Sequence, residues 1–226
     1  MTNICLRIWN WCRRFRHRCG YGVHSPSDFF LITFVIYEKL PYYAYASLHQ
    51  LRNQVTSLPH YREKVDKLLL RLANYLHPSV LFEVGTGGGL STLYLTAGNT
   101  KMKVFTSDYH CNNQVMELLS GSSQISYEQD DINQIQRIWK EMRTSSVMVH
   151  IAHTLRYKEV FEQLVPLVGE QTCFLIGLPY ADKEKERWWK EIIEDERTGV
   201  TFDLYDVGIV FFDKKRIKEH RIVNFF

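Results

Sequence analysis

The chain has 226 residues, of which 45% are hydrophobic and 23% charged, and its formal net charge is +3. This composition excludes an intrinsically disordered chain, which would be depleted in large apolar residues. The length suits one sizeable α/β domain, or a core domain with a small attachment, that can bury a proper hydrophobic core.

The positive charge is concentrated at the amino terminus. The first 27 residues hold five arginines and no acidic residue, and without those five charges the chain would carry −2. The arginines are Arg7, Arg13, Arg14, Arg16 and Arg18. Such a segment could contact nucleic acid, an anionic membrane surface or an acidic partner. The simplest expectation is a solvated, partly frayed basic helix.

The cysteines and the first apolar run favour a cytoplasmic protein. The five cysteines lack the paired spacing of a zinc ribbon or a redox motif, so reduced thiols are expected. The run "FFLITFVIY" (29–37) is shorter than the about 20 apolar residues of a transmembrane helix, so no membrane span is expected. Asp28 abuts this run and "EKLP" (38–41) follows it, which argues against a secretory signal peptide.

The front of the chain is divided by turn signals into short helical segments. The stretch "CGYGVHSP" (19–26) and then Pro41 predict two or three short helices. The next segment, "YREKVDKLLLRLANYLH" (61–77), has its leucines on one stripe and charges elsewhere. It predicts an amphipathic helix that ends near Pro78.

Short β-rich runs then alternate with segments long enough for crossover helices. Strands are expected at 79–84, 103–108, 125–129, 146–152 and 172–177. This order predicts an α/β fold, a Rossmann-like doubly wound and mostly parallel sheet with helices on both faces. Only two residues separate the last runs, 200–205 and 208–212, so these two strands must be antiparallel. Residues 1–60 are expected to form a basic helical extension or lid, and residues 61–226 the main domain.

The stretch "EVGTGGG" (83–89) lies at the first strand-to-helix turn, the usual ligand site of a doubly wound sheet. Its glycines miss the G-x-G-x-x-G spacing of a dinucleotide site, because the sixth position from Gly85 is Leu90. No Gly-Lys-Ser/Thr follows, which excludes a phosphate-binding P-loop. Glu83 would repel a pyrophosphate but suits the ammonium and sulfonium groups of S-adenosylmethionine. The turn residues expected to contact that cofactor are Gly85, Thr86, Gly87 and Gly89.

Two further acids stand where the same cofactor would need them. Asp108 closes the second strand, about 20 residues beyond the glycines, where an acid accepts hydrogen bonds from ribose hydroxyls. Asp131 follows the third strand, where the adenine edge would lie, and Ile132 could pack on the ring.

With these features the sequence resembles class I S-adenosylmethionine-dependent methyltransferases, whose motif is an acid followed by G-x-G-x-G. More closely it is similar to small methyltransferase-like proteins of Bacteroidetes-type bacteria, related to catechol-type O-methyltransferases. The peptides that carry this likeness are "GYGVHSP", "EKLPYYAY", "EVGTGGGLSTLYL", "RYKEVFEQLVPLV" and "VTFDLYDVGIVFF". The resemblance implies a seven-stranded sheet of order 3-2-1-4-5-7-6 with strand 7 antiparallel. It also implies that Glu83 binds near the methionine amino group, Asp108 the ribose and Asp131 the adenine.

The expected catalytic positions depart from that resemblance. Catechol-type relatives hold a divalent cation with carboxylates after the fourth and fifth strands. Here those positions are Ala152 and the pair Gly177 and Leu178, so no metal is expected unless Asp182 or other groups substitute.

Two histidines near the end of the fourth strand could act as general base instead. His153 lies just beyond the strand end and is the first candidate. His150 lies within an apolar strand, where a structural role is the commoner outcome.

The leading hypothesis is a metal-independent, S-adenosylmethionine-dependent enzyme that methylates an oxygen or nitrogen of a small molecule. The alternative is a non-catalytic fold of the same class that binds the cofactor or serves as an interaction protein. A nucleic-acid methyltransferase has only the arginine-rich front in its favour, and the Asn/Asp-Pro-Pro-Tyr/Phe signature after the fourth strand is missing. Homo-oligomerisation is left open.

Overall fold

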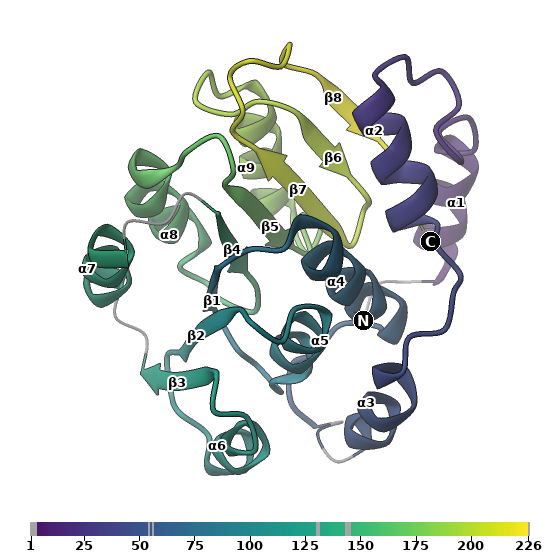
Figure 1. Ribbon diagram of the computed structural model, residues 1–226. Coiled ribbons are helices and arrows are strands. Elements are labelled where there is room, and N and C mark those ends of the chain that lie inside the picture. Colours follow the sequence, from purple (N-terminus) through teal and green to yellow (C-terminus); the bar gives the residue numbers. More distant parts are fainter. Residues whose placement is uncertain (1–3, 54, 56, 130–131, 143–145, 226) are drawn as a thin grey trace.

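The computed structural model describes residues 4–53, 55, 57–129, 132–142 and 146–225. It shows one twisted sheet with helices on both faces (Figure 1). The strands are β1 (Val80–Val84), β2 (Lys103–Asp108), β3 (Ile125–Gln129), β4 (Val147–Ile151), β5 (Cys173–Gly177), β6 (Thr201–Asp203), β7 (Val207–Phe211) and β8 (His220–Ile222). The helices are α1 (Ile4–Arg13), α2 (Pro26–Phe30), α3 (Ala44–Arg52), α4 (Glu63–Leu76), α5 (Leu90–Gly98), α6 (Asn113–Ser120), α7 (Ile132–Met142), α8 (Tyr157–Leu164) and α9 (Lys183–Glu194), with a π-helical turn η1 (Leu31–Ile36) and a 3₁₀ turn η2 (Val165–Leu167). No described helix is both long and apolar enough to cross a membrane.

The sheet has the order β3-β2-β1-β4-β5-β7-β6-β8. The expected order of the first seven strands is confirmed, and β7 runs antiparallel to both β5 and β6. The expectation of seven strands is wrong by one, because β8 pairs in parallel with β6. That strand has three residues in a charged stretch, so it lacks the apolar alternation by which strands are recognised in a sequence.

Alternating side chains along each strand divide the core into two layers. Leu81 of β1 lies in a cluster with Leu68 and Leu69 of α4, and Phe82 lies in a second cluster with Trp189 of α9. The first layer therefore packs under α4, α5 and η1, and the second under α7, α8 and α9 (Figure 1). Glu83 follows Leu81 at the strand period and so points into the first layer.

The amphipathic helix expected over 61–77 forms as α4. Its apolar stripe is buried against the sheet, and Leu68, Leu69 and Leu72 have no exposed surface. His77 takes the left-handed conformation (φ 47°) after its last turn, and Pro78 follows. The helix thus ends where proline restricts the preceding residue and cannot continue the hydrogen-bond ladder.

Two of the five amino-terminal arginines, Arg7 and Arg14, are anchored, which differs from the expectation of a solvated basic helix. Arg14 is buried and binds Asp203 through two guanidinium nitrogens, at 2.8 and 3.0 Å. Arg7 makes the same kind of fork with Asp206, at 2.9 and 2.8 Å. Burial raises the pKa of the two carboxyl groups, but the arginines outweigh it and hold each pKa below its usual range. These ion pairs fasten α1 to the turn between β6 and β7.

The two ion pairs are expected to differ in their contribution to stability. Arg14→Leu leaves the Asp203 charge buried without its cation, which costs about 3 kcal/mol of unfolding free energy. Arg7→Leu costs only about 1 kcal/mol, because Asp206 keeps its second partner, Arg62. Urea denaturation of the two variants measures the difference, and adding Asp203→Asn to Arg14→Leu should recover part of the loss. Equal losses in the two single variants would contradict this ranking.

Candidate functional site

The glycine turn lies at the carboxyl ends of β1 and β4, and it needs glycine for two reasons. Gly85, Gly87 and Gly89 have φ angles of 89°, 57° and 74°, which other residues rarely adopt. The chain after β4 also approaches closely: a Cβ on Gly85 would lie 2.6 Å from the backbone of His153. The His153 amide donates to the Gly85 carbonyl oxygen at 3.0 Å. The β4–α8 loop therefore packs directly against the glycine turn and fixes its position.

Glu83 is fully buried and its carboxylate is surrounded by four side-chain donors from α5, β2 and β4. Ser91 Oγ and His150 Nδ1 donate to Oε1 at 2.9 and 2.8 Å. Thr106 Oγ1 donates to Oε2 at 2.6 Å, and the Thr92 hydroxyl donates to the same oxygen. Burial would raise the pKa of Glu83, but the bond to His150 and the threonine donors outweigh it and hold the pKa below its usual range. Glu83 is thus an internal anion that ties β1, β2, β4 and α5 together.

This arrangement changes the role expected for Glu83. Its relative exposure is 0% and both oxygens are saturated by protein donors, so it has no free position for an ammonium group. Thr86, another expected contact, is also buried, and its hydroxyl lies 2.6 Å from that of Thr106. Glu83 and Thr86 therefore stabilise the conformation of the turn through buried hydrogen bonds.

His150 is a structural residue in this site. It is fully buried, and its second ring nitrogen, Nε2, lies 3.1 Å from the hydroxyl of Tyr61. Because both ring nitrogens are engaged inside the core, His150 has no path to an acceptor. This position speaks against His150 as the general base, the second catalytic candidate from the sequence, and leaves the structural role as the prediction.

Tyr61 fills the place where the resemblance to catechol-type O-methyltransferases predicts a cation site. A Cβ on Gly177 would lie 1.9 Å from the Tyr61 hydroxyl oxygen, so no side chain fits at the end of β5. Ala152 directly follows β4 and lies next to this point, with its Cα 3.3 Å from the same Cβ position. Among the described residues no group of three or more His, Cys, Asp or Glu side chains could hold a metal ion. The donor set therefore does not fit a divalent cation.

His153 packs over the glycine turn with a free nitrogen. Its ring stacks on Tyr61 at a centroid distance of 4.4 Å, and its Nε2 is buried without a hydrogen-bond partner. A Cβ on Gly87 would lie 2.8 Å from the ring. Burial, followed by the nearby His150, lowers the pKa of His153 to about 4. The imidazole is therefore neutral near pH 7.

Asp108 is the expected cofactor residue that the structure leaves accessible. It ends β2 half-buried, and its Oδ2 accepts from the Gly87 amide at 2.9 Å. Its Oδ1 accepts from the Tyr109 amide at 2.8 Å. Each oxygen keeps a further lone pair toward the edge of the sheet.

The other two expected cofactor residues are Asp131 and Ile132, and Ile132 is the first residue of α7. Asp131 lies outside the described residues. Ile132 is buried in the core layer beneath α7, α8 and α9. Nothing in its described surroundings distinguishes it from an ordinary core residue.

The amide groups of the glycine turn are all bonded within the protein. The Gly85 and Thr86 amides donate to the Ser107 carbonyl, and Gly89 donates to Thr86. Gly88 donates to the carbonyl oxygen of Pro59 at 2.8 Å. The segment before α4 thus covers the turn, and an incoming ligand must displace the Pro59 carbonyl to reach the Gly88 amide.

Lys185 is a candidate that sequence reasoning missed. It is 6% exposed, and its ammonium group lies 5.1 Å from the ring centre of Tyr157. Burial lowers its pKa to about 8, and its charge contributes to the lowered pKa of His153, so the two groups are electrostatically linked. The surrounding sequence, "KEKER" (183–187), is typical of a solvated helix face and gave no signal of burial.

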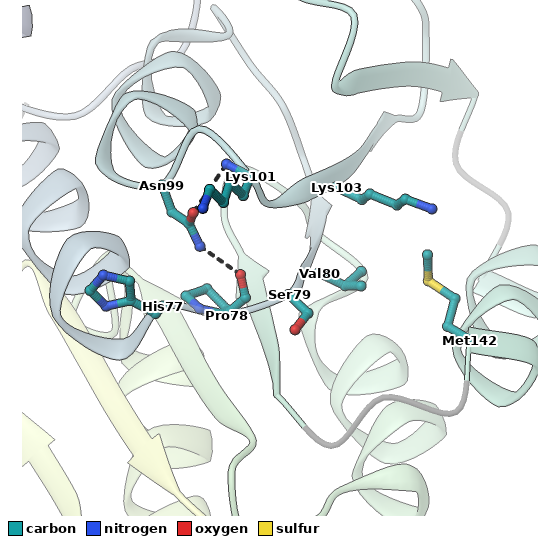
Figure 2. Close-up of a pocket in the computed structure, with 8 residues that line it drawn as sticks. All are labelled: His77, Pro78, Ser79, Val80, Asn99, Lys101, Lys103 and Met142. Atoms are coloured by element: carbon teal, nitrogen blue, oxygen red, sulfur yellow. Dashed lines mark hydrogen bonds between the residues drawn. The ribbon is translucent and has the colours of Figure 1, made fainter.

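A large hollow lies at the opposite edge of the sheet and carries none of this chemistry. It has a volume of about 530 Å³ and lies at the amino ends of β1 and β2. Figure 2 shows its lining, which includes Lys101 and Lys103 but no acidic residue. Ligands of open α/β sheets bind outside the carboxyl ends of the strands, so the glycine turn is the better candidate site.

Comparisons with known proteins agree on the fold. No family model matches the chain, and no curated protein does. Among solved structures, the chain is similar to a Staphylococcus aureus protein named as a caffeoyl-CoA O-methyltransferase (14% identity, 76% of this chain and 93% of that one, TM-score 0.60). It is also similar to the O-methyltransferase TomG of Streptomyces achromogenes in complex with S-adenosylmethionine (15%, 80% and 93%, 0.56). A Bacillus cereus O-methyltransferase in complex with S-adenosylhomocysteine matches as well (15%, 80% and 95%, 0.56). The chain therefore has the fold of class I S-adenosylmethionine-dependent methyltransferases.

The lowered pKa of His153 predicts a specific loss of stability in mild acid. Below about pH 6.5 the unfolded chain binds a proton at this residue. The folded chain does not bind this proton until the pH approaches 4. The free energy of unfolding should therefore fall by about 2 kcal/mol between about pH 7 and pH 5 through this residue alone. In His153→Phe, which keeps a ring over Tyr61, that part of the fall should vanish. Urea denaturation at both pH values measures it, and an equal fall in the two proteins would contradict the assignment.

Proposed function

We propose that this protein binds S-adenosylmethionine at the glycine turn and transfers its methyl group to an oxygen or nitrogen of a small molecule without a resident metal. The observation that carries the proposal is the pairing of Asp108, an accessible acid at the end of β2, with the positive-φ glycine turn. The supporting comparison is that two proteins of this fold, from Streptomyces achromogenes and Bacillus cereus, were crystallised with this cofactor or its product.

In this proposal the residues around the turn divide the work of holding the cofactor. Asp108 accepts hydrogen bonds from the ribose hydroxyls, and Asp131 takes the adenine. Ile132 was the other expected adenine contact, but it is buried in the core and is left out of this role. Gly85 and Gly87 would hold the methionine part, and the Gly88 amide would bind it once released by the Pro59 carbonyl. Glu83 holds the turn in shape without contacting the ligand. Residues 1–60 act as the extension that closes over the site.

The bound sulfonium supplies an already activated methyl group, so the protein has to align the acceptor and remove its proton. His153 is neutral near pH 7 and has a free Nε2, which makes it the candidate base. A group with a pKa of about 4 is a weak base, however. The acceptor that fits best is one whose nucleophilic atom is already acidic or unprotonated, with the Lys185 ammonium offsetting its charge.

The second candidate function is a non-catalytic protein of the same fold. It is favoured by the saturated glycine turn, where each amide already has a protein acceptor. In this case the buried network would be retained for shape, and the turn would bind no ligand.

Calorimetric titration with S-adenosylmethionine and S-adenosylhomocysteine separates the two functions. Micromolar binding is expected, and Asp108→Ala should weaken it by about tenfold to a hundredfold, since charged hydrogen bonds contribute about 1.5–3 kcal/mol. Glu117→Ala, which removes an exposed acid from α6, is the matched control and should bind like wild type. No detectable binding to the wild-type chain would leave the non-catalytic protein.

The protein should also be indifferent to divalent cations. Titration with Mg²⁺, Ca²⁺ or Mn²⁺ is expected to give no saturable heat, because the expected ligand positions hold Ala152, Gly177 and Leu178. The Tyr61 hydroxyl also fills the space beside Gly177. Cofactor binding should be the same with and without EDTA. A chelator-sensitive affinity, restored by one of these ions, would contradict metal independence.

A further inference from the structure

The helix α1 turns its polar side toward the protein and its apolar side toward solvent. Arg7, Asn10 and Arg14 recur at the spacing of one helical face and contact the turn between β6 and β7. Ile8 and Trp9 project from other faces and are 60% and 62% exposed. The ion pairs fix the rotation of the helix, so it cannot turn these two side chains inward. The ion pairs of Arg7 and Arg14 thus keep the apolar side chains of Ile8 and Trp9 exposed to solvent.

Cations without acidic partners surround this apolar face. Arg13 and Arg16 are exposed and make no ion pair with any residue in the described part of the chain. Arg18 is exposed as well, and its guanidinium lies over the rings of Trp11 and Phe15, at 6.0 and 5.6 Å. The first acidic residue of the chain is Asp28. The local positive charge is therefore unbalanced.

A cationic hollow adjoins the same segment. It has a volume of about 380 Å³ and lies between the turn after α1 and β8. Arg16, His17, His220 and Arg221 are among its lining residues. Arg221 is ion-paired with Asp28 and Glu219, so Arg16 is the lining arginine that has no acidic partner in the described part of the chain. This space is large enough for a phosphate group next to Arg16.

We propose that the exposed face of α1, with the arginines that follow it, docks the protein on an anionic lipid bilayer. Tryptophan and aliphatic side chains enter the boundary between headgroups and acyl chains, and arginines bind anionic headgroups. Each basic residue near such a surface contributes about fivefold in affinity. A second copy of this chain is a poorer occupant, because it would bring the arginines of two α1 segments together with no acid to offset them.

The test is co-sedimentation of the full chain with vesicles of phosphatidylcholine alone or mixed with phosphatidylglycerol. Binding is expected only to the mixed vesicles, and added salt should weaken it. Tryptophan emission should shift to the blue on binding, reporting Trp9 and Trp11, because Trp139, Trp188 and Trp189 are at most 5% exposed.

Two double variants address the apolar and the charged contributions. Ile8→Ser with Trp9→Ser should lower the partition coefficient at least about tenfold. Arg13→Gln with Arg16→Gln should lower it by a similar factor and reduce its salt dependence. The matched controls are Met116→Ser on α6 and Arg137→Gln with Lys140→Gln on α7, at the far edge of the sheet (Figure 1). Circular dichroism checks that each variant is folded.

Several results would overturn the proposal. They are no binding to the mixed vesicles, equal binding by the α1 variants and the wild type, or an equal loss in the far-edge controls. Sedimentation velocity that shows a dimer abolished by the Ile8 and Trp9 variant, without vesicle binding, would assign the face to a second copy. Salt-sensitive binding to nucleic acid in place of vesicles would assign it to that partner.

Discussion

The buried carboxylate of Glu83 is the constraint on which the rest of the site depends. An unpaired charge in a protein core costs several kcal/mol, so a buried anion must be surrounded by donors. Here the donors come from β2, from the first turn of α5 and from β4, all on the same face of the sheet. Satisfying one charge therefore fixes the positions of the elements that form the glycine turn. The turn in turn fixes the place of the β4–α8 loop, because Gly85 accepts from the His153 amide.

The same network extends to the segment before α4 and alters the chemistry available at the strand ends. His150 links Glu83 to Tyr61, and the Tyr61 hydroxyl occupies the space next to Gly177. An acid at the end of β5 and a tyrosine at position 61 exclude each other sterically. The Tyr61 side chain thus fills space that a cation site would need for the ion and its carboxylate ligands. Burial then lowers the pKa of His153, which stacks on that tyrosine.

Much of the sheet could be predicted from the sequence, because its strands are apolar runs that alternate with helical segments. The three residues of β8 could not, since nothing in "HRI" distinguishes a strand from a charged loop. The glycine turn and the position of Asp108 at a strand end could be predicted for a similar reason. Both are read from short, continuous stretches of the sequence. The role of Glu83 could not be predicted, because its donors are spread between 8 and 67 residues away in the chain. The anchoring of Arg7 and Arg14 depends on partners 199 and 189 residues away.

Asp206 binds two separate parts of the amino-terminal region, α1 and the segment that covers the glycine turn. It accepts from Arg7 of α1 and from Arg62 at the start of α4, and its backbone carbonyl accepts from the Leu178 amide after β5. Arg62 lies three residues after Pro59, whose carbonyl covers the glycine turn. Opening the turn by moving this segment would pull on the Arg62 ion pair, while the two-nitrogen fork of Arg7 would stay in place. The Arg7–Asp206 fork does not depend on the Arg62–Asp206 ion pair. The segment that covers the turn can therefore shift while α1 remains bonded to the sheet.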